Sequence, residues 1–461
     1  MDNNKYFELA LQHYKELASK KNYKIIKKLY YSTPLKGPHM DFFHLPYSLN
    51  KNTIEENFKR FQRKIIKSIN YLLICEKNKL YLFKEVVNAM IEQIITVLSI
   101  NNTYWINYGF TESDIININK MYEIYKQFLE IYLTRIPITY NNNELYKTCL
   151  YINLTMDVHP KILQNFGLAR ISELINIIKN ITKLSYIDAL TKYRNSGTVI
   201  KSETELTSTI MTCILTLYEK AKVILPSSIK ILEPHKIKIK NIPMLRSKWS
   251  SKGKSSGRFL FINTSHINTY KKESLMILCA HEVIPGHIIF RHNTNKIINS
   301  YCKKQKEYNN KINKKFIKML KNCTKSIHEG FASYAETIMT DLYDNVLDVY
   351  FNQLFRAVKL VIDVGLHSNL AKYTFTVDQA KIFYKNISMY SDDIINADIV
   401  HCLSCPGKAC AYDFGYVNIK YLEQHMLNKG YDIKDFYEWI YKMPLPIKIL
   451  YQSMKNMSNK I

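Results

Sequence analysis

The chain of 461 residues is 47% hydrophobic and 23% charged, which argues against extensive disorder and allows one large domain or about three smaller ones. Only 12 glycines and 12 prolines are available to form turns, so an all-β fold is disfavoured and a mainly α fold is expected. The net charge of +26 is scattered along the chain without one long basic tract, which disfavours nucleic-acid binding as the main role.

The first 40 residues are polar and basic, and residues 1–5 have neither the apolar stretch nor the cleavage site of a secretory signal. No apolar run reaches the length of about 18 residues that is needed to cross a bilayer. Nine cysteines without regular spacing predict reduced thiols instead of a disulfide framework. We therefore expect a cytoplasmic protein that does not interact with membranes.

An irregular segment at 41–46 leads into the body of the chain, and residues from about 53 to 235 carry a mostly helical pattern. Apolar side chains recur at helical spacing in two stretches, where we expect the core-facing sides of helices. These stretches contain Ile65, Ile66, Ile69, Leu72 and Leu73, and then Leu174, Ile175, Ile177, Ile178 and Ile181.

A loop and a strand are predicted ahead of the most informative motif. Residues 248–257 are rich in serine, lysine and glycine and predict a flexible loop, whereas residues 258–264 predict a β-strand. The edge of this strand could pair with an extended peptide, which would make Phe261 and Asn263 substrate-binding residues. An ordinary hairpin strand fits the same pattern.

The segment at 281–287 reads His-Glu-Val-Ile-Pro-Gly-His and follows an apolar run. In the common zinc-peptidase signature H-E-x-x-H, two histidines four residues apart face one metal, and the glutamate lies beside its water. Here the second histidine comes two residues late, and six positions on a regular helix rotate it by roughly 120° from the first. His281 and His287 can share a metal only if Pro285 and Gly286 kink or bulge the chain.

Residues 301–326, rich in lysine and asparagine, predict a solvated amphipathic helix, and a helix of small residues follows at 327–336. Glu329 and Glu336 on the second helix are two turns apart and therefore share one face. One of them could bind zinc while the other orients a ligand histidine. Taken alone, each could equally be a surface carboxylate.

A cysteine pattern further along the chain offers another kind of site. Cys402 and Cys405 form a C-x-x-C pair after His401, and Cys410 follows. This spacing suits a small zinc or redox site, but a structural zinc needs a second pair of ligands, for which no position is evident. Packing of small residues is the simpler interpretation.

Four segments resemble, in the same order, motifs of the DUF885 family. They read H-E-x-x-P-G-H at 281–287, E-G-F-A-S-Y-A-E at 329–336, R-A-V-K-L-V-I-D-V-G-L-H at 356–367 and P-G-K-A-C-A-Y-D-F-G at 406–415. The similarity is clear from about 240 to 450 and fainter upstream. In this family, Pro285 and Gly286 are the expected form of the first motif.

The resemblance implies a zincin-like metallopeptidase of the gluzincin type, which is mainly α and built as one large helical domain. A small β-sheet would lie near the metal helix, beside a deep substrate channel. Residues 1–240 would form a helical wall of this channel, and residues 241–461 would form the catalytic half.

Carried over by position, the resemblance also implies a metal centre. His281, His287 and Glu329 would bind one zinc ion per chain, with Glu282 as the general base and Glu336 orienting a ligand histidine. Three protein ligands leave a position for water, whose pKa zinc lowers toward about 7, and a carboxylate can take its proton during attack on a carbonyl. Peptide hydrolysis is the reaction that suits this chemistry.

Further roles follow from the likeness to helical zinc peptidases. His367 and Tyr412 would donate hydrogen bonds to the oxyanion, although packing in the core is the alternative for both side chains. Arg356 could bind a substrate carboxylate or could brace Asp363. Lys408 stands where glutamine is usual in the family, and this change could shift the substrate preference.

The expected function is zinc-dependent hydrolysis of short or unfolded peptides. The alternative is a catalytically inactive protein of the same fold that binds an anionic partner through its basic surface. The presence of Glu282 argues against this alternative, because an inactive protein would be free to lose its general base.

Overall fold

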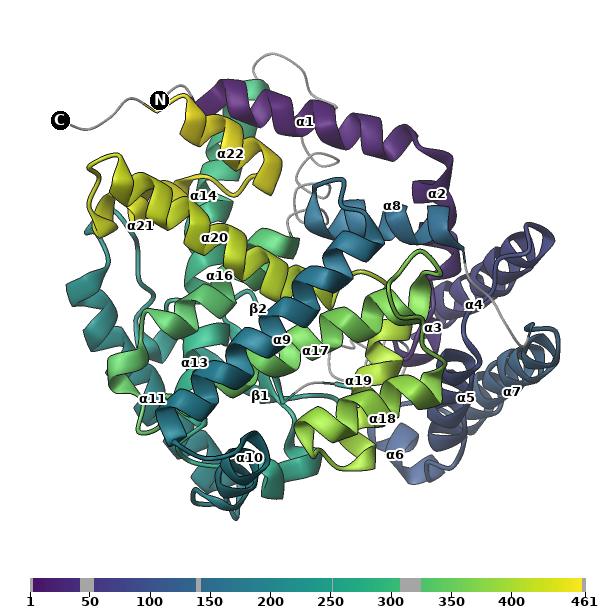
Figure 1. Cartoon of the computed structure of the whole chain (residues 1–461). Helices are drawn as coiled ribbons and strands as arrows, with labels where there is room; N and C mark the ends of the chain where they lie inside the picture. Colours follow the sequence, from purple (N-terminus) through teal and green to yellow (C-terminus); the bar gives the residue numbers. More distant parts are fainter. Residues whose placement is uncertain (1–2, 42–53, 138–141, 251, 307–324, 458–461) are drawn as a thin grey trace.

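α-Helices dominate the computed structural model, and one small sheet of three strands lies among them (Figure 1). The prediction of a mainly α fold is therefore confirmed. The structure describes residues 3–41, 54–137, 142–250, 252–306 and 325–457. Two predicted features lie partly outside these residues, namely the irregular segment at 41–46 from residue 42 onward, and positions 307–324 of the helix predicted at 301–326.

Side chains at the helix starts explain where several helices begin, since Thr111, Thr376 and Asp432 each form a capping box. The helices of the first half are α1 (Asn3–Ser19), α2 (Lys21–Leu29), α3 (Pro38–Asp41), α4 (Ile54–Lys77), α5 (Lys84–Leu98), α6 (Asn102–Asn107), α7 (Glu112–Thr134), α8 (Asn143–Leu154), α9 (Pro160–Thr182), α10 (Tyr186–Asn195), α11 (Glu203–Ile224) and α12 (Met244–Ser247). Those of the second half are α13 (Leu275–Glu282), α14 (His287–Lys306), α16 (Lys325–Thr337), α17 (Leu347–His367), α18 (Val377–Ser388), α19 (Asp392–Ser404), α20 (Cys410–Asn428), α21 (Ile433–Lys442) and α22 (Ile447–Lys455). Short 3₁₀ turns are η3 (Pro234–Lys236), η4 (Thr264–Thr269) and η5 (Thr340–Leu342).

The sheet consists of β1 (Lys238–Asn241), β2 (Gly253–Ser256) and β3 (Phe259–Ile262). β3 lies in the middle, parallel to β1 and antiparallel to β2. The strand predicted at 258–264 is therefore present, but the expectation that it offers a free edge is wrong, because it has a strand on each side. β2 is an edge strand, and it occupies part of the stretch predicted as a loop at 248–257.

The predicted core stripes are buried on one side of each helix. Ile65 and Leu72 of α4 and Leu174 and Ile178 of α9 are at most 2% exposed, as predicted. The expectation that Ile66 and Ile181 also face the core is wrong, because they are 52% and 44% exposed: Ile66 lies beside the buried stripe, and Ile181 lies in the last turn of α9. Residues three or four positions apart thus face the core, and their immediate neighbours face solvent, as expected for amphipathic helices.

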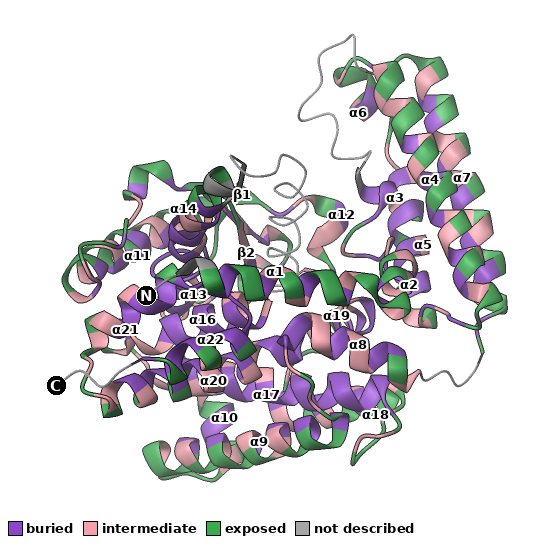
Figure 2. Ribbon diagram, turned by 90° about the horizontal axis from the view of Figure 1, so that it is seen from above, coloured by how far each residue is buried: buried purple, intermediate pink, exposed green. Residues whose placement is uncertain are grey.

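The buried apolar side chains form two main clusters, and each draws on both halves of the chain. One cluster joins α1 and α11 to α13, α14, α16 and α20–α22. The other joins α4, α5, α7 and α9 to α17–α19. Figure 2 shows α17 buried along most of its length. Residues 1–240 and 241–461 therefore share their cores.

α16 and α20 approach each other backbone to backbone. Gly330 of α16 faces Gly415 of α20, and a Cβ at Gly330 would lie 2.4 Å from the carbonyl carbon of Gly415. Glycine at both positions permits this close approach. As a result Glu329 at the start of α16 lies next to the start of α20, where Lys408 and Tyr412 are found.

Candidate metal centre

The helix that carries the first histidine ends immediately after the glutamate. α13 stops at Glu282, and α14 begins at His287. Between them the N–H of Gly286 donates to the carbonyl oxygen of Ala280 at 3.0 Å, so the hydrogen bond reaches six residues back. A regular helix reaches four residues back, and the chain is therefore bulged at this point.

Glycine is required at position 286 by the space available. A Cβ there would lie 1.9 Å from the carbonyl oxygen of His281 and 2.4 Å from that of Ala280. The break also frees backbone groups, and the Tyr441 hydroxyl donates to the carbonyl oxygen of Pro285 at 2.7 Å. The bulge is thus stabilised from within the motif and from a distant helix, α21.

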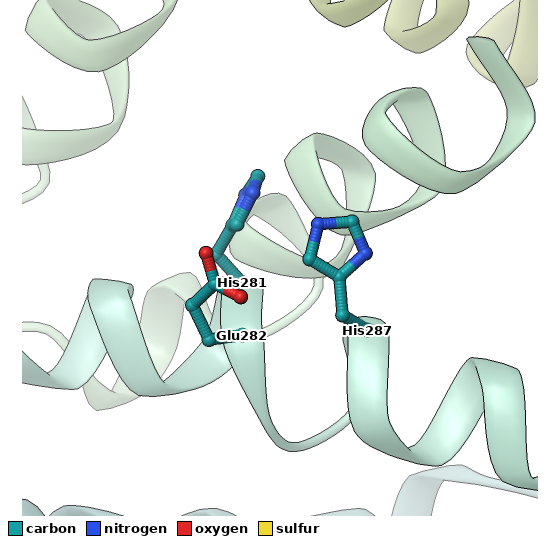
Figure 3. A group of neighbouring side chains, drawn as sticks. All are labelled: His281, Glu282 and His287. Carbon is teal, nitrogen blue, oxygen red and sulfur yellow. The ribbon is translucent and has the colours of Figure 1, made fainter. Parts of the chain in front are cut away.

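The bulge brings both histidines to one place (Figure 3). Their ring centroids are 4.9 Å apart and the ring planes stand at 84°. The ligand atoms of His281, Glu282 and His287 all lie within 4.8 Å of one another. The rotation of roughly 120° that a regular helix would impose does not separate the two side chains, because a new helix begins at His287.

α16 supplies a second carboxylate to the same point. Glu329 Oε2 lies 3.2 Å from His287 Nε2 and 4.0 Å from His281 Nε2. A tetrahedral zinc with bonds of about 2.0–2.1 Å would hold such ligand atoms roughly 3.3 Å apart, so this arrangement fits zinc with little movement. The side chains of His281, His287 and Glu329 are 9%, 10% and 15% exposed, which leaves the buried group a small opening to solvent.

The protonation states of these groups also fit a metal. Burial lowers the pKa of His287, so that its imidazole is neutral near pH 7. Burial would raise the pKa of Glu329, but the hydrogen bond with His287 and the charge of Lys408 hold it well below its ordinary value. Neutral imidazole and ionised carboxylate are the forms that bind zinc.

A carboxylate holds His281 by its other ring nitrogen. Glu336 Oε1 lies 2.7 Å from His281 Nδ1, and Arg356 donates to both oxygens of Glu336. Burial would raise the pKa of Glu336, but the charge of Arg356 and the hydrogen bond with His281 keep it below its ordinary value. When Nδ1 donates its proton to Glu336, the lone pair of His281 Nε2 is free to face Glu329 and His287.

Replacing Glu336 by glutamine is expected to weaken zinc binding by about 10- to 100-fold, because the ring of His281 loses the anion that orients it. The measurement is a titration of metal-free protein with chelator-buffered zinc. Glu423 is a matched control, since it is also largely buried and pairs with a lysine, Lys420, within its own helix. Equal zinc affinities of Glu336→Gln and Glu423→Gln would contradict the orienting role.

Glu282 is positioned by β2 and α14. Ser255 Oγ donates to Glu282 Oε2 at 2.7 Å. Arg291 donates to the carbonyl oxygen of Ser255 at 3.0 Å and also to its hydroxyl oxygen, and a further nitrogen donates to the carbonyl oxygen of His287 at 3.0 Å. These contacts fix the carboxylate of Glu282 beside the two histidines.

Ser255 and Arg291 were not predicted as site residues from the sequence. Arg291 lies four residues after His287 and therefore one helical turn from a predicted ligand, which is a usable signal. Ser255 carries no such signal, because the stretch 248–257 reads as a loop and its contact with Glu282 depends on the pairing of the sheet.

The C-terminal motif brings two predicted residues close to the centre. The ring of Tyr412 lies nearly parallel to that of His281, at 16° and with centroids 6.4 Å apart. Burial, followed by the charge of Glu329, raises the pKa of the Tyr412 phenol, which therefore keeps its proton. Lys408 Nζ lies 3.8 Å from Glu329 Oε1.

Among the described residues, His367 is not in contact with the histidine and glutamate group. Its ring stacks on Tyr146 with centroids 5.3 Å apart, and its Nε2 lies 3.2 Å from the carbonyl oxygen of Cys402. Burial lowers its pKa to about 4. His367 lines a small separate pocket together with Phe83 and Pro406.

Arg356 pairs with Glu336, and the alternative in which it braces Asp363 is not observed. Asp363 instead accepts hydrogen bonds from the Tyr146 hydroxyl at 2.7 Å and from the N–H of Gly407 at 2.8 Å. Burial raises the pKa of Asp363 to about 7. Its role in the structure is to hold the loop that leads into α20.

The two candidates near β3 lie in different surroundings. Phe261 is on the same face of the sheet as Lys254, whose Nζ is 5.8 Å from the ring centroid. Asn263 is 2% exposed, and its amide donates to the carbonyl oxygens of Ser247 and Ser250. Asn263 thus closes the preceding loop, whereas Phe261 is half-buried.

The cysteines near the end of α19 are not arranged as a metal site. Cys402 and Cys410 are buried, and the seven cysteines whose side chains the structure describes are all free thiols. Within the part of the chain that the structure describes, the group of His281, Glu282 and His287 is the one with metal-ligand spacing. This agrees with packing as the simpler interpretation of the C-x-x-C pair.

The family model for DUF885, described as bacterial protein of unknown function, matches residues 115–454. No curated protein matches the chain. The crystal structure of a predicted lipoprotein from Colwellia psychrerythraea is 16% identical, with a TM-score of 0.77 over 92% of this chain and 80% of its own. A predicted lipoprotein of unknown function from Shewanella oneidensis is 15% identical, with a TM-score of 0.63 over 98% of this chain and 92% of its own. Both similarities concern the fold.

The cytoplasmic location expected from the sequence is contradicted by these two neighbours, because both are described as lipoproteins. A lipoprotein is held at a membrane by an attached lipid and needs no spanning helix. Lack of a long apolar run therefore does not indicate the cytoplasm. None of the helices within the described ranges is long and apolar enough to cross a bilayer.

Proposed function

This chain belongs to the DUF885 family, and we propose that it is a zinc-dependent hydrolase of short or unfolded peptides. One observation carries the proposal. The ligand atoms of His281, His287 and Glu329 converge from separate segments, with the carboxylate of Glu282 beside them. Such a group would be costly to bury without a cation, because its polar atoms lose their hydration.

We further propose that the fold is zincin-like, of the gluzincin type, and that each chain binds one zinc ion. The order of the ligands supports this assignment, since two histidines flank the helix break and the third ligand, Glu329, comes from a later helix. The 15% exposure of Glu329 is the reason to expect a channel from solvent to the site. A peptide would reach the centre through this channel.

Under this proposal, Glu282 acts as the general base beside the bound zinc ion. When bound, zinc would acidify a water molecule toward a pKa of about 7 and polarise the scissile carbonyl. Glu282 would take the proton of the attacking water and pass it to the leaving amine. The hydrogen bond from Ser255 to Glu282 Oε2 would hold this carboxylate in place while it accepts the proton.

Tyr412 is our candidate for a donor to the oxyanion. Its phenol keeps its proton, and its ring lies beside that of His281. A hydrogen bond from this hydroxyl would stabilise the charge that develops on the carbonyl oxygen. We assign no such role to His367, because its Nε2 lies against the carbonyl oxygen of Cys402.

The proposal is tested by metal analysis of the purified protein and by digestion of a peptide library followed by mass spectrometry. Close to one zinc per chain and defined cleavage products would support it, and metal-free protein under zinc-replete conditions would refute it. Zinc binding without any cleavage would favour the inactive binding protein. The cleavage positions would also distinguish carboxypeptidase, dipeptidase and endopeptidase action.

A further inference from the structure

Cations from separate segments surround the two carboxylates of the proposed site. Lys408 Nζ lies 3.8 Å from Glu329 Oε1. Lys254 is on β2, next to Ser255, whose hydroxyl donates to Glu282. Both lysine side chains are partly buried, and the charge of Glu282 acts on each of them.

Two more cations, Arg246 and Lys325, lie near Lys254 and Lys408. Burial lowers the pKa of Lys254 to about 8, and the charges of Arg246 and Lys408 contribute to the shift. Burial also lowers the pKa of Lys325 at the start of α16, again with a contribution from Lys408. Charged groups that shift the pKa of one another in this way lie close together. With a pKa of about 8, Lys254 is still mostly protonated at pH 7.

These cations have few counterions in the protein. Among the residues described by the structure, the ammonium groups of Lys254 and Lys325 have neither an ion pair nor a hydrogen bond, and that of Lys254 lies instead over the ring of Phe261. The carboxylate beside Lys408 belongs to Glu329, which is a proposed zinc ligand. A bound zinc ion would add two further positive charges. An anionic ligand would therefore recover free energy that the burial of these cations costs.

We propose that the site selects peptides that carry a carboxylate close to the scissile bond, and that Lys254 and Lys408 bind this carboxylate. The inference rests on the proposed function and names its substrate class. The carboxylate can belong to an aspartate or glutamate side chain or to the C-terminus of the peptide, since both offer the same group to a lysine. Phe261, next to Lys254, offers an apolar surface to the adjoining part of the peptide. The net charge of +26 adds long-range attraction for acidic peptides.

Binding of fluorescent peptides to zinc-loaded Glu282→Gln protein, measured by anisotropy, tests this selection without cleavage. Four peptides of one length are compared, with glutamate or glutamine at internal positions and with a free or an amidated C-terminus. Peptides that carry the recognised carboxylate are expected to bind about tenfold more tightly or better than the neutral, amidated peptide. The preference should fall as salt is added. The peptide pair that shows the preference identifies the side chain or the C-terminus as its source.

Lys254→Gln, introduced into the same protein, is expected to weaken binding of the preferred peptide by about tenfold and to change binding of the neutral one little. Lys179→Gln is the matched control, because it removes the same charge from an exposed position of α9, outside the sheet. Circular dichroism and zinc content check that each variant is folded and loaded.

Equal binding of all four peptides would overturn the inference, as would a preference that survives in both Lys254→Gln and Lys408→Gln. Either result can occur in a protein whose wild-type form holds zinc and cleaves peptides, so the proposed function would stand. Selective binding by a protein that cleaves no peptide would overturn the proposed function and leave the carboxylate site in place.

Discussion

Replacing Glu282 by glutamine is expected to leave zinc bound and to lower kcat/KM for peptide hydrolysis by about 10²- to 10⁴-fold. Glutamine has nearly the same shape, and its carbonyl oxygen can accept the hydrogen bond that Ser255 donates to Glu282. The amide cannot take a proton from water at neutral pH. The measurements are zinc content by atomic absorption and steady-state kinetics on a peptide identified by the library digest.

Glu329→Gln is the variant to compare with Glu282→Gln, because both exchange one carboxylate for an amide in the same buried group. Glu329→Gln removes a proposed ligand and is expected to lose zinc together with activity. Both carboxylates lie near the histidines, so the comparison also decides which of them binds the metal. Loss of zinc from Glu282→Gln with retention by Glu329→Gln would reverse the two roles. Undiminished cleavage by Glu282→Gln would refute the general base.

The need for an irregular backbone at 281–287 could be predicted from spacing alone, because six residues of regular helix carry a side chain about 120° around the axis. The form of this irregularity could not be predicted from the spacing. It depends on a hydrogen bond from Gly286 to Ala280 and on the Tyr441 hydroxyl, which comes from α21. A tertiary contact over such a distance leaves no trace in the local sequence.

Strands were harder to place than helices for a related reason. A helix with one buried face shows its period within a single segment, as Ile65 and Leu72 do. The position of β3 in the middle of the sheet depends on its partners, β1 and β2, and the period of β3 does not reveal them. The role of Ser255 follows from that pairing, and so it could be recognised only in the structure.

The same limit applies to the two predicted oxyanion donors. His367 and Tyr412 both lie in segments that resemble family motifs, but a motif does not state which way a side chain points. α17 is buried on most sides, so a histidine at its end can be satisfied away from the metal, as the contact with Cys402 shows. Tyr412 lies beside His281 because α20 packs closely on α16.

The net charge of the chain did not predict where in the structure the positive side chains would cluster. The excess of 26 positive charges is spread over the whole sequence, and nothing in it indicates that Lys254, Lys325 and Lys408 would gather. They come from an edge strand, a helix start and a loop. Their proximity follows from the packing that also brings Glu329 to the histidines, so the proposed substrate preference and the proposed metal centre have one structural origin.

Replacing Gly286 by alanine is expected to lower the free energy of unfolding by at least about 3 kcal/mol and to abolish stable zinc binding. The added Cβ would lie 1.9 Å from the carbonyl oxygen of His281, and because both are backbone-fixed atoms the bulge itself must move. Any such movement displaces His287, the next residue, from its place opposite His281. Denaturant unfolding of metal-free protein and zinc titration measure the two effects separately.

Gly253→Ala is the matched control, since Gly253 is a buried glycine of β2 beside the same site. A Cβ at Gly253 would first meet Leu278 Cδ1 at 3.2 Å, which is the flexible end of a side chain, so a cost of about 1 kcal/mol or less is expected. If Gly286→Ala were as stable as Gly253→Ala and still bound zinc, the bulge would not be what brings His281 and His287 together. A regular helix could not replace it, because His281 and His287 would then point about 120° apart. The Gly286→Ala variant therefore tests whether the bulge that accommodates the two extra residues between His281 and His287 is required for the metal centre.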